Sequence, residues 1–307
     1  MKILYRALGI VVATSLIIVF LTGTVAFIKS AWFKKSTASS EHVAVVDISG
    51  VITSAAAFLR DLEEVLDDPN TKAIVVRINS PGGLVGPSQE MFDALLQADK
   101  KVPVVVSMGA LAASGGYYAA LGGRTVFANP GTLTASIGVI MELANTEKLY
   151  QWAKVERFTI KAGKFKDAGT PLRAMKPEER ELLTTMLLDV HEQFKAAVKE
   201  RRKLSPQEVE QWTDGRVMTG KQAKEAKLVD ALGGFEAAVA EAKRQAKLPA
   251  SAEILYPSEE GGILRKIIFG REESRFQHVV NWLENQSSVV TPALSPGWRV
   301  MLLAPVR

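Results

Sequence analysis

Apolar and polar positions alternate along the chain in blocks that predict strands and helices in regular succession. An apolar run from Val43 to Gly50 is typical of a buried strand, and an amphipathic stretch follows from Ser54 to Leu66. A second apolar run covers Ala73 to Ile78, after which the order repeats. Strands too apolar to face water on either side, alternating with helices, indicate an α/β fold with a mostly parallel sheet covered on both faces.

The repeated part contains two segments rich in glycine and other small residues. Asn79 to Gly83 predicts a turn leading into a helix at about Ser88 to Ala98, followed by a strand at 102–108. The small-residue segment Ala110 to Ala120 is expected to form a buried helix, and a strand at 125–129 follows it.

The second half of the body is predicted to be mainly helical. A long helix is expected after Pro177, then a helical pair at Pro206 to Trp212 and Gly220 to Ala226, and a last amphipathic helix at about Phe235 to Gln245. Beyond Ala250 the pattern weakens, and the tail is expected to be ordered only by packing on another surface.

The N-terminal region is interpreted as a membrane anchor. Residues Ala7 to Ile28 carry no charge, and at about 1.5 Å per residue such a helix spans a hydrocarbon core of about 30 Å. A cleaved signal peptide is the alternative, but its apolar region is usually shorter and Lys29 follows where a small-residue cleavage site belongs. The basic residues on the two sides of the span are nearly balanced, so charge alone does not orient it.

These patterns divide the chain into four parts. We expect a signal anchor at 1–35, a short tether at 36–42, a catalytic or binding domain at 43–250, and a C-terminal extension at 251–307 that would suit a subunit contact.

The basic charge of the chain belongs to its N-terminal arm. Five basic residues precede the first acidic residue, Glu41, and the rest of the chain carries 33 basic and 33 acidic residues. The body therefore lacks the electrostatic footprint of a nucleic-acid binder. The absence of cysteine excludes disulfides, thiolate metal sites and a cysteine nucleophile.

Histidine is scarce, and this limits the possible chemistry. None of the three histidines, His42, His191 and His278, has the sequence neighbourhood of a general base, and no HExxH motif is present. This scarcity disfavours a histidine-rich metal site, and any covalent chemistry must use another base. We expect neither a metal nor a cofactor.

Two segments that follow buried strands are candidates for a catalytic centre. Ser80 to Gly83 (SPGG) provides glycines whose backbone N–H groups can approach an oxyanion closely, although it also fits an ordinary turn in which Ser80 is structural. Ser114 lies at the predicted start of a helix, where it is either an N-cap or a nucleophile. Both lie at consecutive strand ends of one parallel sheet, where such folds bind ligands, and this favours a site.

A candidate base comes from a loop after the strand-like segment Val155 to Ile160. This loop carries Lys161, Lys164 and Lys166 within six residues. A lysine acts as a general base only when it is uncharged, which requires burial or a cationic neighbour. The residues alone leave open which lysine, if any, meets that condition.

Five motifs in order give the chain a family resemblance. INSPGG, GALAASGGYY, GTLTASIGVI, KAGKFKDAGTPLR and DGRVMTGKQAKEAKLVDALGG resemble the signal peptide peptidase A family of membrane-anchored serine proteases, in its short form, over about Val43 to Lys247. The first motif and AKLVDALGG also resemble Clp proteases and the crotonase superfamily, which implies a Clp protease/crotonase-like ββα spiral.

The resemblance implies specific roles for five residues. Ser114 matches the nucleophile of a Ser/Lys dyad, and Lys166, rather than Lys164, matches the general base because it directly precedes Asp167. Ser136 matches a serine that orients the lysine amine. The family's oxyanion hole maps to the backbone N–H groups of Gly83 and Gly115.

The resemblance also implies a setting for the reaction. Family members degrade released signal peptides and other membrane-proximal peptides, form homo-oligomers, and hold the catalytic domain on the extracytoplasmic side of the bacterial inner membrane. In short forms the lysine reaches the serine of a neighbouring subunit. The alternatives are an acyl-CoA enzyme of the crotonase type, which leaves Ser114 and the anchor unexplained, and an inactive membrane scaffold.

Overall fold

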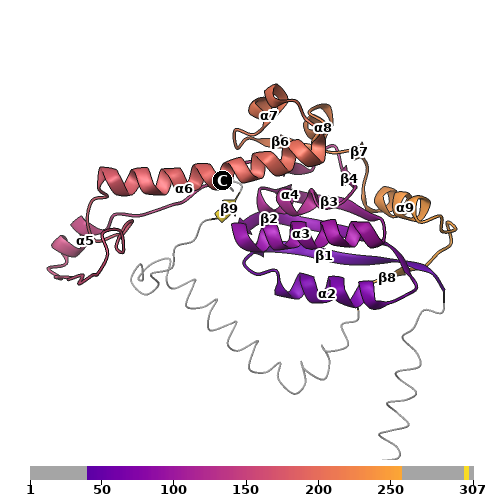
Figure 1. Cartoon of the computed structure of the whole chain (residues 1–307), viewed down its shortest axis with the longest axis horizontal. Coiled ribbons are helices and arrows are strands. Elements are labelled where there is room, and N and C mark those ends of the chain that lie inside the picture. The colour runs from indigo at the N-terminus through magenta and orange to yellow at the C-terminus, as the bar shows by residue number, and fades with distance from the viewer. Residues whose placement is uncertain (1–39, 258–300, 304–307) are drawn as a thin grey trace, which may run out of the picture. The chain divides into compact units, whose positions relative to one another are not determined.

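The strands of the computed structural model, which describes residues 40–257 and 301–303, form one mixed, mostly parallel sheet (Figure 1). Its main path runs β6-β5-β3-β2-β1-β8, with β4 beside β3, β7 beside β4, and β9 beside β2. Only the β5–β6 and β2–β9 pairs are antiparallel among the described strands. The bounds are β1 His42–Ile52, β2 Thr71–Leu84, β3 Val104–Ala113, β4 Thr125–Ala128, β5 Leu133–Ala135, β6 Val217–Thr219, β7 Ala231–Leu232, β8 Ile254–Leu255 and β9 Met301–Leu303.

Helices connect these strands and cover the sheet. They are α2 Ala56–Asp67, α3 Val85–Lys101, α4 Gly115–Ala120, α5 Glu147–Trp152, α6 Pro177–Arg202, α7 Pro206–Trp212, α8 Gly220–Glu225 and α9 Phe235–Gln245. The predicted α/β architecture with a mostly parallel sheet is confirmed, and it is consistent with a Clp protease/crotonase-like fold.

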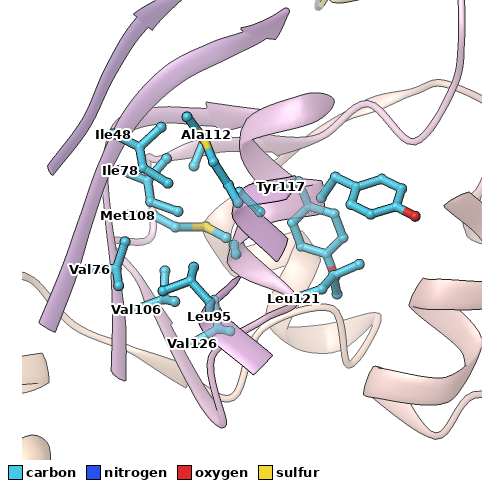
Figure 2. Packing of buried hydrophobic residues seen from close by; sticks show 14 of the residues in the cluster. Ile48, Val76, Ile78, Leu95, Val106, Met108, Ala112, Tyr117, Leu121 and Val126 are labelled. Atoms are coloured by element: carbon cyan, nitrogen blue, oxygen red, sulfur yellow. The ribbon is translucent and has the colours of Figure 1, made fainter. Parts of the chain in front are cut away.

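The two faces of the sheet bury two separate apolar clusters, as the two-residue period of a strand requires. In β1, Val46 and Ile48 face the larger cluster, which includes residues of α2, α3, α4 and α6. Figure 2 shows part of this cluster, with β2 and β3 side chains packed near Leu95 and Tyr117. Val45, between Val46 and Ala44, faces the smaller cluster formed with α9.

Three local predictions are wrong. The predicted turn at Asn79–Gly83 is the end of β2, because β1 and β3 both pair with this segment and register shifts accommodate its irregular backbone. Ala110–Ala113 extends β3, so the buried helix begins only at Gly115. Val155–Ile160 forms no strand because it has no sheet partner there, and Phe158 and Ile160 are exposed.

The predicted membrane span at 7–28 and most of the predicted C-terminal extension lie outside the described residues. Within residues 40–257 and 301–303, no helix is long and apolar enough to cross a membrane. The tail contributes β9, whose Leu302 pairs with Gly83 of β2.

Candidate active site

Ser114 occupies a sharp turn between β3 and α4. Its backbone N–H donates to the carbonyl of Ala135 at 2.8 Å, and its own carbonyl accepts from the N–H of Tyr118 at 2.8 Å. These bonds hold Ser114 at φ 53° and ψ −120°, a conformation outside the helical, extended and left-handed regions. A non-glycine residue held so costs about 1–3 kcal/mol, and a strained serine between a strand and a helix is the geometry of a nucleophile elbow.

The hydroxyl of Ser114 is buried and lacks a hydrogen-bond partner. The residue has no exposed surface, and among the described residues its Oγ is one of two buried side-chain polar atoms without a partner. Burying an unsatisfied hydroxyl costs about 1–3 kcal/mol. Ser114 occupies the N-cap position of α4, but its side chain makes no capping bond, and its hydroxyl has no partner within the described residues.

Gly83 and Gly115 lie against each other at this turn. A Cβ built on Gly115 would stand 3.2 Å from the backbone nitrogen of Gly83 and 2.4 Å from the Oγ of Ser88. A Cβ on Gly83 would stand 2.1 Å from the carbonyl oxygen of Ile52. Both positions therefore require glycine for reasons of space, and the structure places the two predicted oxyanion residues together beside Ser114.

Ser136 is brought next to Ser114 by the sheet. Ala113 of β3 pairs with Ala135 of β5, and each serine is the residue that follows. Ser136 is buried, has a φ of 52°, and donates its N–H to the carbonyl of Arg216 at 2.9 Å. The turn after β5 is thus held with a positive φ at Ser136 by a backbone bond to Arg216.

Ser80, considered above as a turn residue, has a structural role. It is buried within β2, and its Oγ accepts the N–H of Gly82 at 3.0 Å.

Lys166 lies on an exposed loop held together by short turns. Its backbone N–H donates to Gly163 at 3.3 Å, and the N–H of Ala168 donates to Phe165 at 3.0 Å. The side chain of Lys166 is exposed, whereas Ala168 is buried. Since Ser114 Oγ has no partner within the described residues, Lys166 and Ser114 are not hydrogen-bonded within one chain.

The two other lysines of the loop are engaged with carboxylates. Lys161 pairs with Asp167, and Lys164 pairs with Glu178 at 2.7 Å and lies over the ring of Phe165. In the described part of the chain Lys166 has no ion pair. Of the three lysines, Lys166 is therefore the one that no carboxylate of the described residues holds, but its exposure in a single chain does not meet the burial that an uncharged amine requires.

A charged network fixes the residue after Lys166. Hydrogen bonds from Lys161 and then from Arg173 lower the pKa of Asp167 to about 2. Hydrogen bonds from Arg173 and from the backbone of Lys176 lower the pKa of Glu179 to about 2. The same two carboxylates raise the pKa of Arg173. The network keeps all three groups charged at neutral pH.

The two histidines within the described residues, His42 and His191, form hydrogen bonds with distant parts of the chain. His191 Nε2 lies 2.8 Å from the carbonyl of Thr213 and 3.2 Å from that of Ile137. Carbonyls only accept, so this nitrogen carries a proton and cannot take one from a serine. His42 is buried against Thr71, with Nε2 and Oγ1 3.1 Å apart. His278 lies outside the described residues.

Sequence reasoning missed Arg173 and Glu179, and it did not predict which groups His191 contacts. Pro177 at the first helical position and Glu179 at the third were readable signs of a helix start, and in the structure Glu179 Oε2 accepts the backbone N–H of Lys176 at 3.0 Å. No local signal indicated that His191 joins Ile137, 54 residues away, to Thr213.

Comparison with known proteins gives consistent matches over this region. Residues 96–249 match the model of peptidase family S49. The chain is 40% identical to a putative protease of Synechocystis sp. over 206 residues, 66% of this chain and 73% of the other. It is 29% identical to a putative signal peptide peptidase SppA of Enterococcus faecium, covering 73% of this chain and 70% of the other. It is 31% identical to the chloroplastic serine protease SPPA of Arabidopsis thaliana, covering 73% of this chain and 35% of the other.

Proposed function

Because this chain belongs to peptidase family S49, the signal peptide peptidase A family, and is a serine peptidase, we propose that Ser114 and Lys166 form its catalytic dyad, with Lys166 supplied by a neighbouring copy. The observation that carries this proposal is the strained, fully buried Ser114, whose Oγ has no partner within the described residues of one chain.

The site supports acyl transfer through a serine ester. Ser114 Oγ attacks the peptide carbonyl carbon while its proton passes to the uncharged amine of Lys166. The carbonyl oxygen becomes an oxyanion next to the N–H groups of Gly83 and Gly115. Collapse of this intermediate breaks the C–N bond, and the leaving amine takes the proton from Lys166. Water, activated by the same amine, then hydrolyses the acyl-enzyme. Ser136, beside Ser114, is assigned to orient that amine.

Helix α6 supports a dyad between copies. Near its start, Glu179 binds Arg173, which also binds Asp167 and so anchors the loop at 161–171, called the lysine loop below. Further along the helix, Phe194 packs on Tyr118, with ring centroids 4.6 Å apart. The backbone N–H of Tyr118 donates a hydrogen bond to the carbonyl of Ser114. At about 1.5 Å per residue, Glu179 and Phe194 lie about 22 Å apart on a straight helix. The lysine loop and the turn that carries Ser114 therefore contact helix α6 at points that are far apart along it.

Apolar residues near the lysine loop support the proposed homo-oligomer. Trp152, Phe158 and Ile160 are 82%, 83% and 100% exposed. Exposed aromatic and aliphatic side chains concentrated in one segment mark protein contact surfaces. A second copy that covers this segment would also receive Lys166.

The substrate and location follow the family resemblance and the N-terminal pattern. We assign the enzyme to membrane-proximal peptides, with released signal peptides as the first candidates, on the basis of the apolar stretch at 7–28 and of the name of the Enterococcus faecium relative. The catalytic domain is assigned to the extracytoplasmic side of the bacterial inner membrane. The proposal includes no cofactor, metal or nucleic acid.

Complementation between inactive chains tests this function. Ser114→Ala and Lys166→Ala should each abolish hydrolysis of a peptide ester. When the two full-length chains are co-expressed, random assembly should leave about one quarter of the sites with both an intact serine and an intact lysine, and activity should return to about that level. Full activity in either single variant would disprove the dyad. Inactive singles with no recovery in the mixture would place both groups in one chain.

A further inference from the structure

Arg173 joins the lysine loop to the start of α6. Its Nη2 donates to Asp167 Oδ2 at 2.9 Å, and its Nη1 donates to Glu179 Oε2 at 2.9 Å. A second bond, from Nη2 to Glu179 Oε1, makes the contact with Glu179 bidentate. A planar guanidinium engaged in this way fixes direction as well as distance.

The anchor on α6 is rigid. Glu179 is 1% exposed, and its Oε2 also accepts the backbone N–H of Lys176, the residue before the helix, at 3.0 Å. A carboxylate removed from water keeps its charge only while its partners remain in place. Glu179 therefore holds the guanidinium in one position relative to the helix.

Asp167 transmits this position to Lys166. It is the next residue in the chain, its side chain is 12% exposed, and Lys161 holds it from a second direction. The N–H of Thr170 donates to the carbonyl of Asp167 at 3.0 Å, so the backbone is tied at the same point. A shift of Asp167 must therefore move Lys166.

We propose that Arg173 is a positioning residue for catalysis, which sets the direction of Lys166 by bridging Asp167 to Glu179. This inference rests on the proposed role of Lys166. Arg173 acts on the lysine that its own chain donates and not on the serine of that chain. Misplacing a reacting group by about 1 Å costs on the order of 100-fold in rate, so loss of Arg173 should lower kcat 10- to 100-fold with little change in KM.

Chain-specific complementation tests the proposal. Ser114→Ala/Arg173→Met is co-expressed with Lys166→Ala, so that every complete site uses a lysine beside Met at position 173. In the reciprocal pair, Ser114→Ala is co-expressed with Lys166→Ala/Arg173→Met. The reference for both pairs is the parent mixture, in which Ser114→Ala is co-expressed with Lys166→Ala. We expect the first pair to be 10- to 100-fold less active than the parent mixture, and the second pair to be as active as the parent mixture. Equal losses in both pairs would show a general folding role, and no loss in either would show that Arg173 does not position Lys166.

Single variants of the intact chain make the result independent of complementation. Arg173→Met should lower kcat with KM retained, and Arg173→Lys, which reaches one carboxylate rather than two, should be intermediate. Arg244→Met removes an exposed pair with Glu241 on α9 and should leave kcat unchanged. If the wild-type protein is active but the parent mixture is inactive, the proposal of a dyad between two chains is disproved. The single variants at Arg173 still test the role of Arg173 in that case. An unchanged kcat in Arg173→Met then overturns the inference.

Discussion

The backbone nitrogen of Gly83 lies 3.2 Å from the point where a Cβ on Gly115 would stand, so a methyl group at position 115 would crowd this nitrogen. The same Cβ would meet Ser88 Oγ at 2.4 Å. We predict that Gly115→Ala lowers kcat/KM on a peptide ester at least 100-fold, as expected when an oxyanion donor is displaced.

A matched pair of variants separates the two contacts of Gly115→Ala. Adding Ser88→Ala removes the 2.4 Å clash but not the approach to Gly83, so the double variant should regain thermal stability without regaining activity. Gly86→Ala introduces a methyl group with nothing within 4 Å, and should keep full activity. Recovery of activity in the double variant would contradict the role given to the Gly83 amide.

The strain at Ser114 predicts an inverted order of stability. Ser114→Gly and Ser114→Ala both remove the hydroxyl, but only glycine adopts φ 53° and ψ −120° without strain. Ser114→Gly should therefore be more stable than Ser114→Ala by about 1 kcal/mol in urea unfolding, even after the larger entropy of glycine in the unfolded chain. At Ser88, within α3, the order should be the usual one, with alanine more stable by about 1 kcal/mol. Equal ranking at both sites would refute strain at Ser114.

Acid should loosen the lysine loop. The pKa values of Asp167 and Glu179 fall from 3.8 and 4.5 to about 2 on folding. Since both are lowered, their stabilising contribution is complete above about pH 4.5 and is lost as the pH falls towards 2. Amide hydrogen exchange of peptides covering 163–173, corrected for intrinsic rates, should show constant protection from pH 7 to 5 and a fall below 4.5.

The variant Arg173→Met provides the control for this titration. Without the guanidinium the two carboxylates lose a shared cause of their low pKa, so protection should be weaker at neutral pH and should change less below pH 4.5. A pH dependence identical to that of wild type would show that other groups hold the loop.

Much of the scaffold was predictable because strands buried on both faces leave a continuous apolar signal. Helix α9 was predicted at its observed bounds for a related reason, since one face packs on the sheet through Ala238, Val239 and Ala242. The backbone strain of Ser114 was not predictable, because φ and ψ depend on bonds to Ala135 and Tyr118 made only in the fold. The sequence also did not show which of the three lysines is free of an ion pair, because partners such as Glu178, which pairs with Lys164, are brought together only by folding.

The hydroxyl of Tyr117 offers a last prediction about the support beneath the site. Tyr117 is fully buried in α4, three residues after Ser114, and donates to the carbonyl of Leu228 at 2.7 Å. Burial raises its pKa, so it remains a neutral donor throughout the working range. Tyr117→Phe leaves that carbonyl unsatisfied and should cost about 1–3 kcal/mol in urea unfolding. Since the ring still packs on Phe194, the turn at Ser114 should persist and kcat should stay within about twofold of wild type. A large loss of kcat with unchanged stability would mean that the hydroxyl, and not the ring, supports the nucleophile.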